Sequence, residues 1–443
     1  MLARLFAVLL SVIALPAWAV PPVTTWQTAN GARVVFVETR ELPIVDVSVV
    51  FDAASARDGS RPGLARLTSA LLAEGAAGLS ADAIAERFAA IGAQFATDSL
   101  RDMASIGLRS LSESATLDAA VDLATKILTR PDFPADAIER VRRQMLVALQ
   151  QVEQSPDDLV EREFYRLLYG DHPYASPPEG TAAAVAALTR EDVREFWGRY
   201  YVGRNAVVAI VGDLDRAKAE RLATSLVGAL PAGEPASPLP AVQSLGAARR
   251  VNLEHPSTQT HLRLGEAAIS RTDPDYFPLY VGNHALGGSG LVSALAEEVR
   301  EKRGLSYSVY STLSPMRMEG PFYVGLQTRN DQTGEAVGVA LETLRRFVRD
   351  GPTEQELDAA KRNITGGFAL RLDSNKKILG QIAAIAFYGL PLDYLATFSD
   401  QVNAVTVESV GVAFRRHIDL DRLLTVTVGQ PSGDGLARTS ASP

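Results

Sequence analysis

The sequence has 443 residues, 47% of them apolar and 22% charged, and a formal net charge of −8 at pH 7. This composition is typical of a globular protein with enough apolar residues for two to four domains. Acidic and basic residues are interspersed, so no basic block predicts binding to nucleic acid or to an anionic membrane. The sequence contains no cysteine, which excludes disulfides, thiol nucleophiles and thiolate metal sites.

Residues 1–19 have the features of a secretory signal peptide. Arg4 precedes an apolar run from Leu5 to Leu15, and alanines stand at positions 17 and 19, where a signal peptidase requires small residues. The run is shorter than the roughly 20 residues of a membrane-spanning helix. We therefore expect cleavage after residue 19, export to the periplasm and no membrane anchor. An uncleaved anchor is the alternative.

The next segments predict a strand and then a helix. In "IVDVSVVFDA", Val45, Val47, Val49 and Phe51 alternate with Asp46 and Ser48, as in a strand with one buried face. In "SADAIAERFAAIG", an N-capping Ser80 precedes apolar residues at helical spacing.

Between these two segments, "GLARLTSALLAEG" at residues 63–75 predicts a helix whose leucines form one buried stripe. Positions 66, 69 and 70 lie together on its surface, because residues three and four apart are neighbours. Histidines at 66 and 70 with glutamate at 69 would form His-x-x-Glu-His, which holds zinc and activates a water molecule. The chain has Arg66, Ser69 and Ala70 instead. Arginine has no free lone pair, alanine has no donor atom and serine is a poor zinc ligand.

The histidines give little support for another metal site. No two of the five stand three or four residues apart, at positions 172, 255, 261, 284 and 417. His255 and His261 flank the start of a predicted strand, near Glu254 and Glu266, which leaves a metal site there as an alternative. Isolated surface histidines are far commoner than metal ligands.

Two distant segments predict an internal repeat. "LTREDVREFWGRYYVGRNAVVAIVGD" from residue 188 and "VTVESVGVAFRRHIDLDRLLTVTVGQ" from residue 405 each predict a Thr-capped helix, a turn and a buried strand ending at glycine. Thr189 and Thr406 are 217 residues apart. Further matches at nearly this spacing are Pro134 with Pro352, and Tyr169-Gly170 with Tyr388-Gly389.

We therefore predict an α+β protein of two homologous halves, residues 23–230 and 245–432. In each half an antiparallel-type sheet is expected to be covered by helices on one face. The proline-rich "LPAGEPASPLPA" predicts an extended linker over residues 231–244. Residues 433–443 have little to bury and are expected to be disordered.

The second half contains "LGGSGLVSALAEEVREKRGLSYSVYS". A glycine-rich turn is expected to open a helix that buries Leu291, Leu295 and Val299, with Arg300 in its last turn. A strand should follow, with Tyr307 just inside it. The helix-to-strand turn can bring Arg300 and Tyr307 together, and both side chains can donate hydrogen bonds to a carbonyl or an oxyanion. The alternative is two structural residues, an arginine at a helix C-terminus and a sheet tyrosine.

In order and spacing, these motifs resemble the insulinase- and pitrilysin-type zinc metallopeptidases, especially the members similar to the mitochondrial processing peptidase. The resemblance covers roughly residues 23–432 and includes "YGDHPYASPPEGT" and "SALAEEVREKRGLSYSVYS". In active members the helix matching residues 63–75 carries His-x-x-Glu-His. A glutamate ligand follows on a later helix similar to "QMLVALQQVEQ", where this sequence has Ala148. The resemblance therefore implies that all four metal positions have changed and that this chain holds no zinc.

Active members also use an arginine and, seven residues later, a tyrosine, which match Arg300 and Tyr307. In related two-chain members, the subunit that supplies this pair lacks the zinc helix, which its partner carries. The resemblance thus implies a pseudo-peptidase subunit, inactive alone, that binds peptide beside a homologous subunit with an intact His-x-x-Glu-His. The alternative is a non-catalytic scaffold or peptide-binding protein of the same fold. The missing ligands disfavour a self-sufficient hydrolase.

Overall fold

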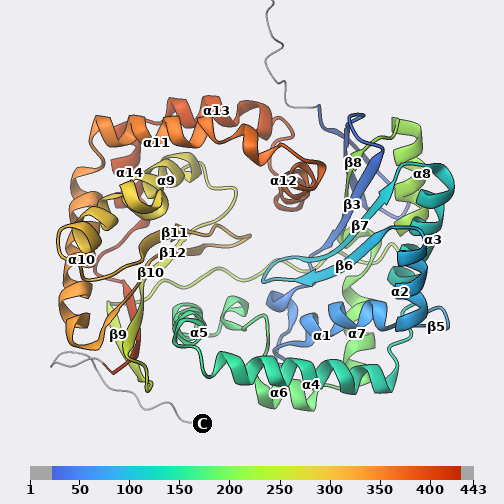
Figure 1. Cartoon of the computed structure of the whole chain (residues 1–443), viewed down its shortest axis with the longest axis horizontal. Coiled ribbons are helices and arrows are strands. Elements are labelled where there is room, and N and C mark those ends of the chain that lie inside the picture. The colour runs from blue at the N-terminus through green and yellow to red at the C-terminus, as the bar shows by residue number, and fades with distance from the viewer. Residues whose placement is uncertain (1–21, 431–443) are drawn as a thin grey trace, which may run out of the picture.

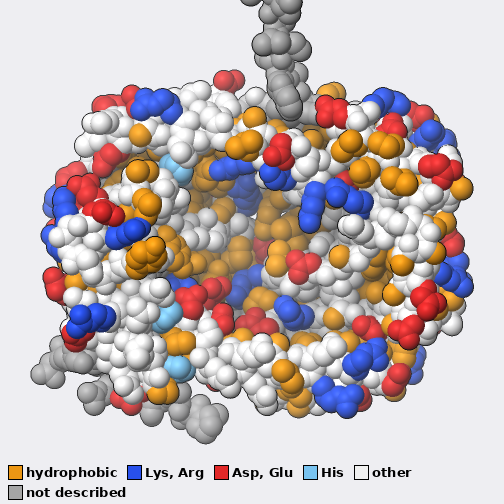
Figure 2. Space-filling model, in the orientation of Figure 1, with side chains coloured by type: hydrophobic (Ala, Val, Ile, Leu, Met, Phe, Trp, Pro, Cys, Tyr) orange, Lys and Arg blue, Asp and Glu red, His pale blue; other side chains and the backbone are white. Residues whose placement is uncertain are grey.

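The computed structural model describes residues 22–430 of the chain, so the predicted signal peptide (1–19) and tail (433–443) lie outside the described residues. Two large sheets, each with its own helices, lie on either side of the molecule's centre (Figure 1). The space-filling view shows a hollow between them, with apolar, basic and acidic side chains on its walls (Figure 2). No helix among the described residues is long and apolar enough to cross a bilayer.

Within the described residues, the first sheet has six strands in the order β1-β2-β8-β3-β7-β6. They are β1 (Thr24–Gln27), β2 (Arg33–Glu38), β3 (Ile44–Phe51), β6 (Gln94–Ser99), β7 (Ala104–Leu111) and β8 (Ala206–Gly212). The helices of this half are α1 (Leu64–Leu71), α2 (Ala81–Ala90), α3 (Ser114–Thr129), α4 (Ala135–Val152), α5 (Pro156–Tyr169), α6 (Ala182–Ala187), α7 (Arg190–Tyr200) and α8 (Arg216–Val227). A short hairpin, β4 (Gly75–Ala76) and β5 (Leu79–Ser80), follows α1.

The second sheet has five strands in the described part of the chain, in the order β11-β12-β10-β13-β9. They are β9 (Arg249–Glu254), β10 (Gln259–Ile269), β11 (Val309–Leu313), β12 (Gly320–Arg329) and β13 (Leu424–Gly429). The α-helices of this half are α9 (Tyr276–Asn283), α10 (Thr333–Asp350), α11 (Glu354–Gly366), α12 (Asn375–Tyr388), α13 (Tyr394–Ala404) and α14 (Val407–His417). Two π-helical segments lie between α9 and β11, at His284–Gly288 and Ala296–Glu301.

Apart from β1, the two sheets share one strand order. In each half the first strand pairs with the last in parallel, as β2 with β8 and β9 with β13. The second strand then lies beside the last, and the third forms the edge. The predicted α+β class and the two homologous halves are confirmed. Each antiparallel-type sheet contains one parallel pair, because the first and last strands of each half lie side by side.

The landmarks of the predicted repeat occupy equivalent places. Thr189 and Thr406 cap α7 and α14, each through a reciprocal capping box that satisfies backbone donors of the first turn. Gly170 and Gly389 end α5 and α12 with positive φ angles, a conformation that favours glycine. The 217- to 219-residue spacing seen in the sequence therefore reflects matching helix ends.

Each half also places one helix on the sheet of the other half, which the sequence did not predict. Helix α12 packs on β3 and β8, and α5 packs on β10 and β13 (Figure 1). Helices therefore cover both faces of each sheet rather than one. The face of β3 that was predicted to be polar is therefore covered: Asp46 is buried in an ion pair with Arg109, and Ser48 is half-buried. Val50 on the same face joins the core that contains α12.

The proline-rich segment between the halves has no helix or strand, although it lies wholly within the described residues. It is extended but packed against the first half. The Ser237 carbonyl accepts a hydrogen bond from Arg57, and the Pro240 carbonyl lies 3.0 Å from His172 Nε2. Leu239 is buried. This packing holds the connection against the first half instead of leaving it as a free tether.

Candidate functional site

Helix α1 is held tightly at its N-terminus and along one face. Gly63 has φ 96°, and a Cβ atom there would lie 3.0 Å from the Val185 side chain. The buried Asp58 carboxylate accepts hydrogen bonds from the Gly63 and Ala65 amides, both at 2.8 Å. Burial raises the pKa of this carboxyl to about 7. The predicted leucine stripe is confirmed, with Leu64, Leu67, Leu71 and Leu72 buried.

The four positions that would hold zinc do not form a metal site. Arg66 is exposed and Ala70 is half-buried on α1, and Ala148 is exposed on α4. Ser69 is buried, and its hydroxyl donates to the Asp98 carbonyl on β6 at 3.3 Å. The set thus offers one hydroxyl, already used, and no imidazole or carboxylate. These residues do not fit zinc.

The alternative metal site around His255 and His261 does not assemble either. His261 Nδ1 lies 3.4 Å from an Asp157 carboxylate oxygen. Glu266 lies elsewhere, where its carboxylate accepts a hydrogen bond from the Asp419 amide at 2.6 Å. Neither histidine belongs to a cluster of three ligand-type side chains among the described residues.

One cluster of ligand-type side chains does occur in the described part of the chain, at Asp273, Asp275 and His417. Its groups are already bonded to one another and to the protein. The two His417 ring nitrogens lie 3.0 Å from Asp275 and 3.0 Å from the Ala268 carbonyl. Arg416 donates to the same Asp275 oxygen. We assign this cluster a structural role in joining α14 to α9 and β10.

The structure brings Arg300 and Tyr307 together. The guanidinium carbon of Arg300 lies 4.8 Å from the centre of the Tyr307 ring, within range of a cation–π contact. Arg300 is partly exposed, and Tyr307 is 81% exposed. Apart from the contact with Glu301 at 3.4 Å, no ion pair holds Arg300 among the described residues. Both side chains can therefore reach a molecule outside this chain.

Two local predictions for this segment are wrong. Leu291 is 63% exposed, because a short 3₁₀ turn at Gly290–Val292 follows the glycines and the wide helix begins later; Leu295 and Val299 are buried as predicted. Tyr307 lies before the strand rather than inside it, because β11 begins at Val309. Ser306 explains the bend, since its hydroxyl donates to the Ser308 and Gln327 carbonyls and occupies groups that a strand would pair.

Two buried acidic residues were not predicted from the sequence. Glu298 lies on the π-helical segment that carries Arg300 and is bonded to three basic side chains. The charge-rich "AEEVREKR" was the available signal, but it does not tell which glutamate is buried. Asp102 lies in the turn between β6 and β7 and contacts both halves. Its only sequence context is a loop, so no pattern marks it.

Comparison with known proteins identifies the family. Residues 33–182 match the family model "Insulinase (Peptidase family M16)", and residues 187–364 match "Peptidase M16 inactive domain". A Mycobacterium tuberculosis protein named "uncharacterized zinc protease" is 30% identical over 426 residues, which cover 94% of this chain and 95% of that protein. The chain belongs to the insulinase family of peptidases, M16. The resemblance inferred from the motifs is confirmed.

Other relatives fit an inactive-type M16 member. The Helicobacter pylori protein named "Non-peptidase homolog YmxG" is 26% identical and covers 93% of this chain, with 95% of its own length matched. The crystal structure of a Pseudomonas fluorescens "peptidase M16 inactive domain" superposes with a TM-score of 0.89 at 40% identity, over 95% of this chain and all of that one. Together with the donorless face of α1, these matches support a pseudo-peptidase of the M16 family.

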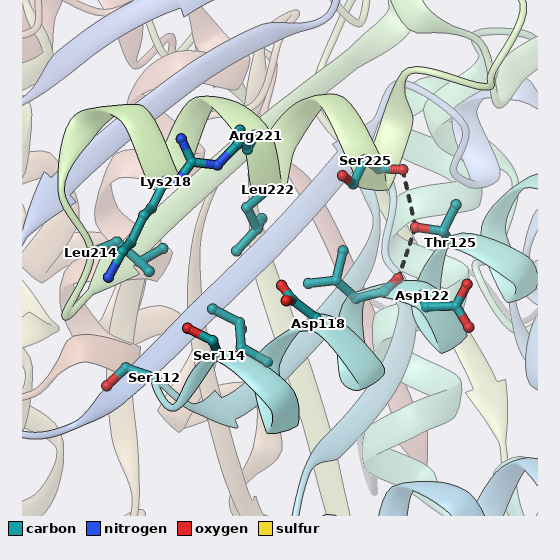
Figure 3. A pocket seen from close by; sticks show the side chains of 12 residues that line it. Ser112, Ser114, Asp118, Asp122, Thr125, Leu214, Lys218, Arg221, Leu222 and Ser225 are labelled. Carbon is teal, nitrogen blue, oxygen red and sulfur yellow. Dashed lines mark hydrogen bonds between the residues drawn. The ribbon is translucent and has the colours of Figure 1, made fainter.

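A cavity of about 490 Å³ on the outer side of the first half is separate from these features. It lies between α3 and α8 and is lined by residues that include Asp118, Asp122, Lys218 and Arg221 (Figure 3). Thr125 joins the two helices by donating to the Ser225 carbonyl at 3.1 Å. Neither the α1 metal positions nor Arg300 and Tyr307 line it, so we assign it no part in peptide chemistry.

Proposed function

We propose that this chain is a periplasmic pseudo-peptidase subunit of a heteromeric zinc endopeptidase. The observation that carries the proposal is the exposed Arg300–Tyr307 pair in a chain whose α1 offers no imidazole or carboxylate at the metal positions. An exposed aromatic ring stacked with an arginine contributes little to a core. It is suited to a partner or substrate that approaches from outside.

In this proposal, the partner is a homologous subunit with an intact His-x-x-Glu-His that provides the zinc and the general base. Arg300 and Tyr307 contribute hydrogen-bond donors. The guanidinium and the phenol hydroxyl hold the carbonyl of the scissile peptide and stabilise the negative charge that develops on its oxygen. This chain therefore requires no metal of its own for its role.

The peptide is expected to bind in extended form. Strands β6 and β11 are the edges of the two sheets that flank the hollow, and an edge strand has backbone groups free to pair with a peptide. Strand β11 begins two residues after Tyr307, and β6 contacts α1 through Ser69. Both edges thus lie beside a position that is functional in active members of the family.

Export to the periplasm is part of the proposal and rests on residues 1–19, with their apolar run and alanines at 17 and 19. The lack of cysteine suits an exported chain that folds without disulfides. N-terminal sequencing of the protein recovered from the periplasm should give a chain that begins at residue 20. Recovery of the full-length chain from the membrane fraction would support the uncleaved anchor instead.

Reconstitution tests the proposed function. Peptide cleavage is measured for this chain, for a zinc-bearing homologous subunit and for their mixture. We expect cleavage only in the mixture, and a fall in kcat of about 10²–10³ with Arg300→Ala or Tyr307→Phe, the usual cost of losing an oxyanion donor. Arg349→Ala is the matched control, because Arg349 is exposed and its one ion pair within residues 22–430 is with the adjacent Asp350.

The outcomes separate the alternatives. Full activity of the mixture with both Arg300→Ala and Tyr307→Phe would show that this chain is a scaffold or a peptide-binding protein. Cleavage by this chain alone, inhibited by a chelator, would show a self-sufficient hydrolase and overturn the proposal.

A further inference from the structure

We infer that Glu298 is a positioning residue that holds the side chains of Arg300 and Tyr307 where a partner or substrate can reach them. It does so by binding three cations on the side of the helix away from the pair. The inference concerns the internal structure of this chain, and its effect on catalysis rests on the proposed function.

Glu298 joins its own helix end to a neighbouring helix. One carboxylate oxygen accepts hydrogen bonds from Lys302 Nζ at 3.0 Å and from Arg346 Nη2 at 3.2 Å. The other accepts from Arg303 Nη1 at 2.7 Å, and the same nitrogen donates to the Glu298 carbonyl at 2.8 Å. Arg346 belongs to α10, so this carboxylate fixes the Arg300-bearing segment to the outer helix of the second half.

The three cations are 40–51% exposed, whereas the one carboxylate that they share is largely buried. The Glu298 side chain is 11% exposed. Hydrogen bonds from Arg303 and Lys302 lower its pKa to about 2, so the carboxylate stays ionised across the physiological range. Without it, the three basic groups would keep, among the described residues, one acidic partner, Glu297, which binds Lys302.

Glu298 and Arg300 stand two positions apart, so their side chains leave the helix on roughly opposite sides. Glu298 faces α10, Arg300 faces Tyr307, and the buried Val299 lies between them in the chain. Because Glu298 holds the helix against α10, it sets the position of Arg300 without touching the Arg300 side chain.

The same anchor extends to Tyr307 through the backbone. The Gly304 amide donates to the Arg300 carbonyl and the Leu305 amide donates to the Val299 carbonyl, both at 2.9 Å. Thr328 on β12 then donates to the Leu305 carbonyl at 2.5 Å. The chain between the two presented side chains is thus fixed at the helix end and at the sheet. Loss of the Glu298 contacts would free the attachment at the helix end and leave the attachment at the sheet.

The test uses Glu298→Gln and Glu298→Ala, with Glu335→Gln as the control, because Glu335 is exposed on α10 and the variant removes the same charge outside the cluster. In the isolated chain, hydrogen exchange at the amides of residues 296–308 should speed up in Glu298→Ala and less in Glu298→Gln. The control should match the wild type. Unchanged exchange in both Glu298 variants would overturn the inference, whether or not the mixture with a zinc subunit is active.

A second arm measures catalysis in the mixture. Glu298→Ala should lower kcat by about 10- to 100-fold, as expected for a displacement of the reacting groups by about 1 Å, and should change KM little. In a chain that already carries Arg300→Ala and Tyr307→Phe, it should cause no further loss. An equal further loss in that background would show a general structural role and contradict the positioning role.

Discussion

The exposed Tyr307 and the buried Glu298 show how little of a residue's role can be read from its type alone. Tyrosine usually lies in a sheet or a core, yet this ring is 81% exposed and stacked with Arg300. Glutamate usually lies in solvent, yet Glu298 is largely buried among three cations. The resemblance to active family members singled out Arg300 and Tyr307, whereas only the structure distinguished Glu298 from the adjacent Glu297.

Glu266 provides a prediction about pH. Burial raises the pKa of its carboxyl to about 8 from an ordinary 4.5, so between these values the folded chain holds a proton that the unfolded chain has released. Stability therefore falls as pH rises through this window. Glu266→Gln cannot ionise, so its unfolding temperature relative to the wild type should rise from pH 5 to about pH 8 and level off above it.

The size of this effect follows from the same linkage, since each pKa unit corresponds to about 1.4 kcal/mol. The comparison requires thermal unfolding of both proteins at several pH values. Glu254→Gln is the control, because Glu254 is exposed at the end of β9. A difference between Glu266→Gln and wild type that stays constant with pH would contradict the account.

At the scale of helices and strands, the sequence patterns correctly predicted the features that depend on neighbouring residues. The Thr189 and Thr406 caps, the leucine stripe of α1 and the strands ending at Gly212 and Gly429 were all found as predicted. Each depends on neighbours within a few residues. The exchange of α5 and α12 between the halves was not predictable, because an apolar helix face does not indicate which sheet it covers.

The candidate site also has features that the sequence predicted and features that only the structure showed. The loss of ligands at Arg66, Ser69, Ala70 and Ala148 follows from residue identity alone, but the commitment of Ser69 to β6 required the structure. The spacing of Arg300 and Tyr307 predicted their meeting. It did not predict the bend at Ser306 that leaves Tyr307 outside the strand.

Helix α1 uses Ser69 for a contact with β6, so placing the motif glutamate there should be costly. Ser69 is 3% exposed, and its hydroxyl faces the Asp98 carbonyl. Ser69→Glu would place a carboxylate in a buried position against that oxygen, and it should destabilise the fold by about 3 kcal/mol or more. Denaturant unfolding measures the change.

Ala148→Glu is the matched control for this prediction, because the position is exposed on α4 and tolerates a charge. It should leave the unfolding midpoint nearly unchanged. Equal stability of the Ser69→Glu and Ala148→Glu variants would show that α1 still has room for a metal-site carboxylate.

At the scale of the whole molecule, one buried carboxylate joins the two halves. Asp102 accepts hydrogen bonds from Tyr174 at 2.7 Å, from the Arg317 amide at 2.8 Å and from Tyr388 at 3.1 Å. The Met318 amide donates to Tyr174 at 3.0 Å. We call these five residues the clasp. They tie the turn between β11 and β12, and the end of α12, to the first half.

Removing the clasp carboxylate should loosen the halves. Asp102→Ala leaves buried donors without an acceptor, each at a cost of about 1–3 kcal/mol. We expect lower stability and faster cleavage by trypsin after Arg317, which the clasp now holds. Asp358→Ala, at an exposed position on α11, is the control. Equal resistance of the two variants to trypsin would show that the clasp does not hold the halves together.

The central claim is that this M16 chain has lost its own zinc and works through Arg300 and Tyr307. Its most direct test is the zinc content of the purified mature chain after exhaustive dialysis, measured by mass spectrometry of the metal. The account predicts far less than one zinc ion per chain. One retained zinc per chain would contradict it, provided that the ion remains in His417→Ala, which removes the one other cluster of ligand-type side chains found among the described residues.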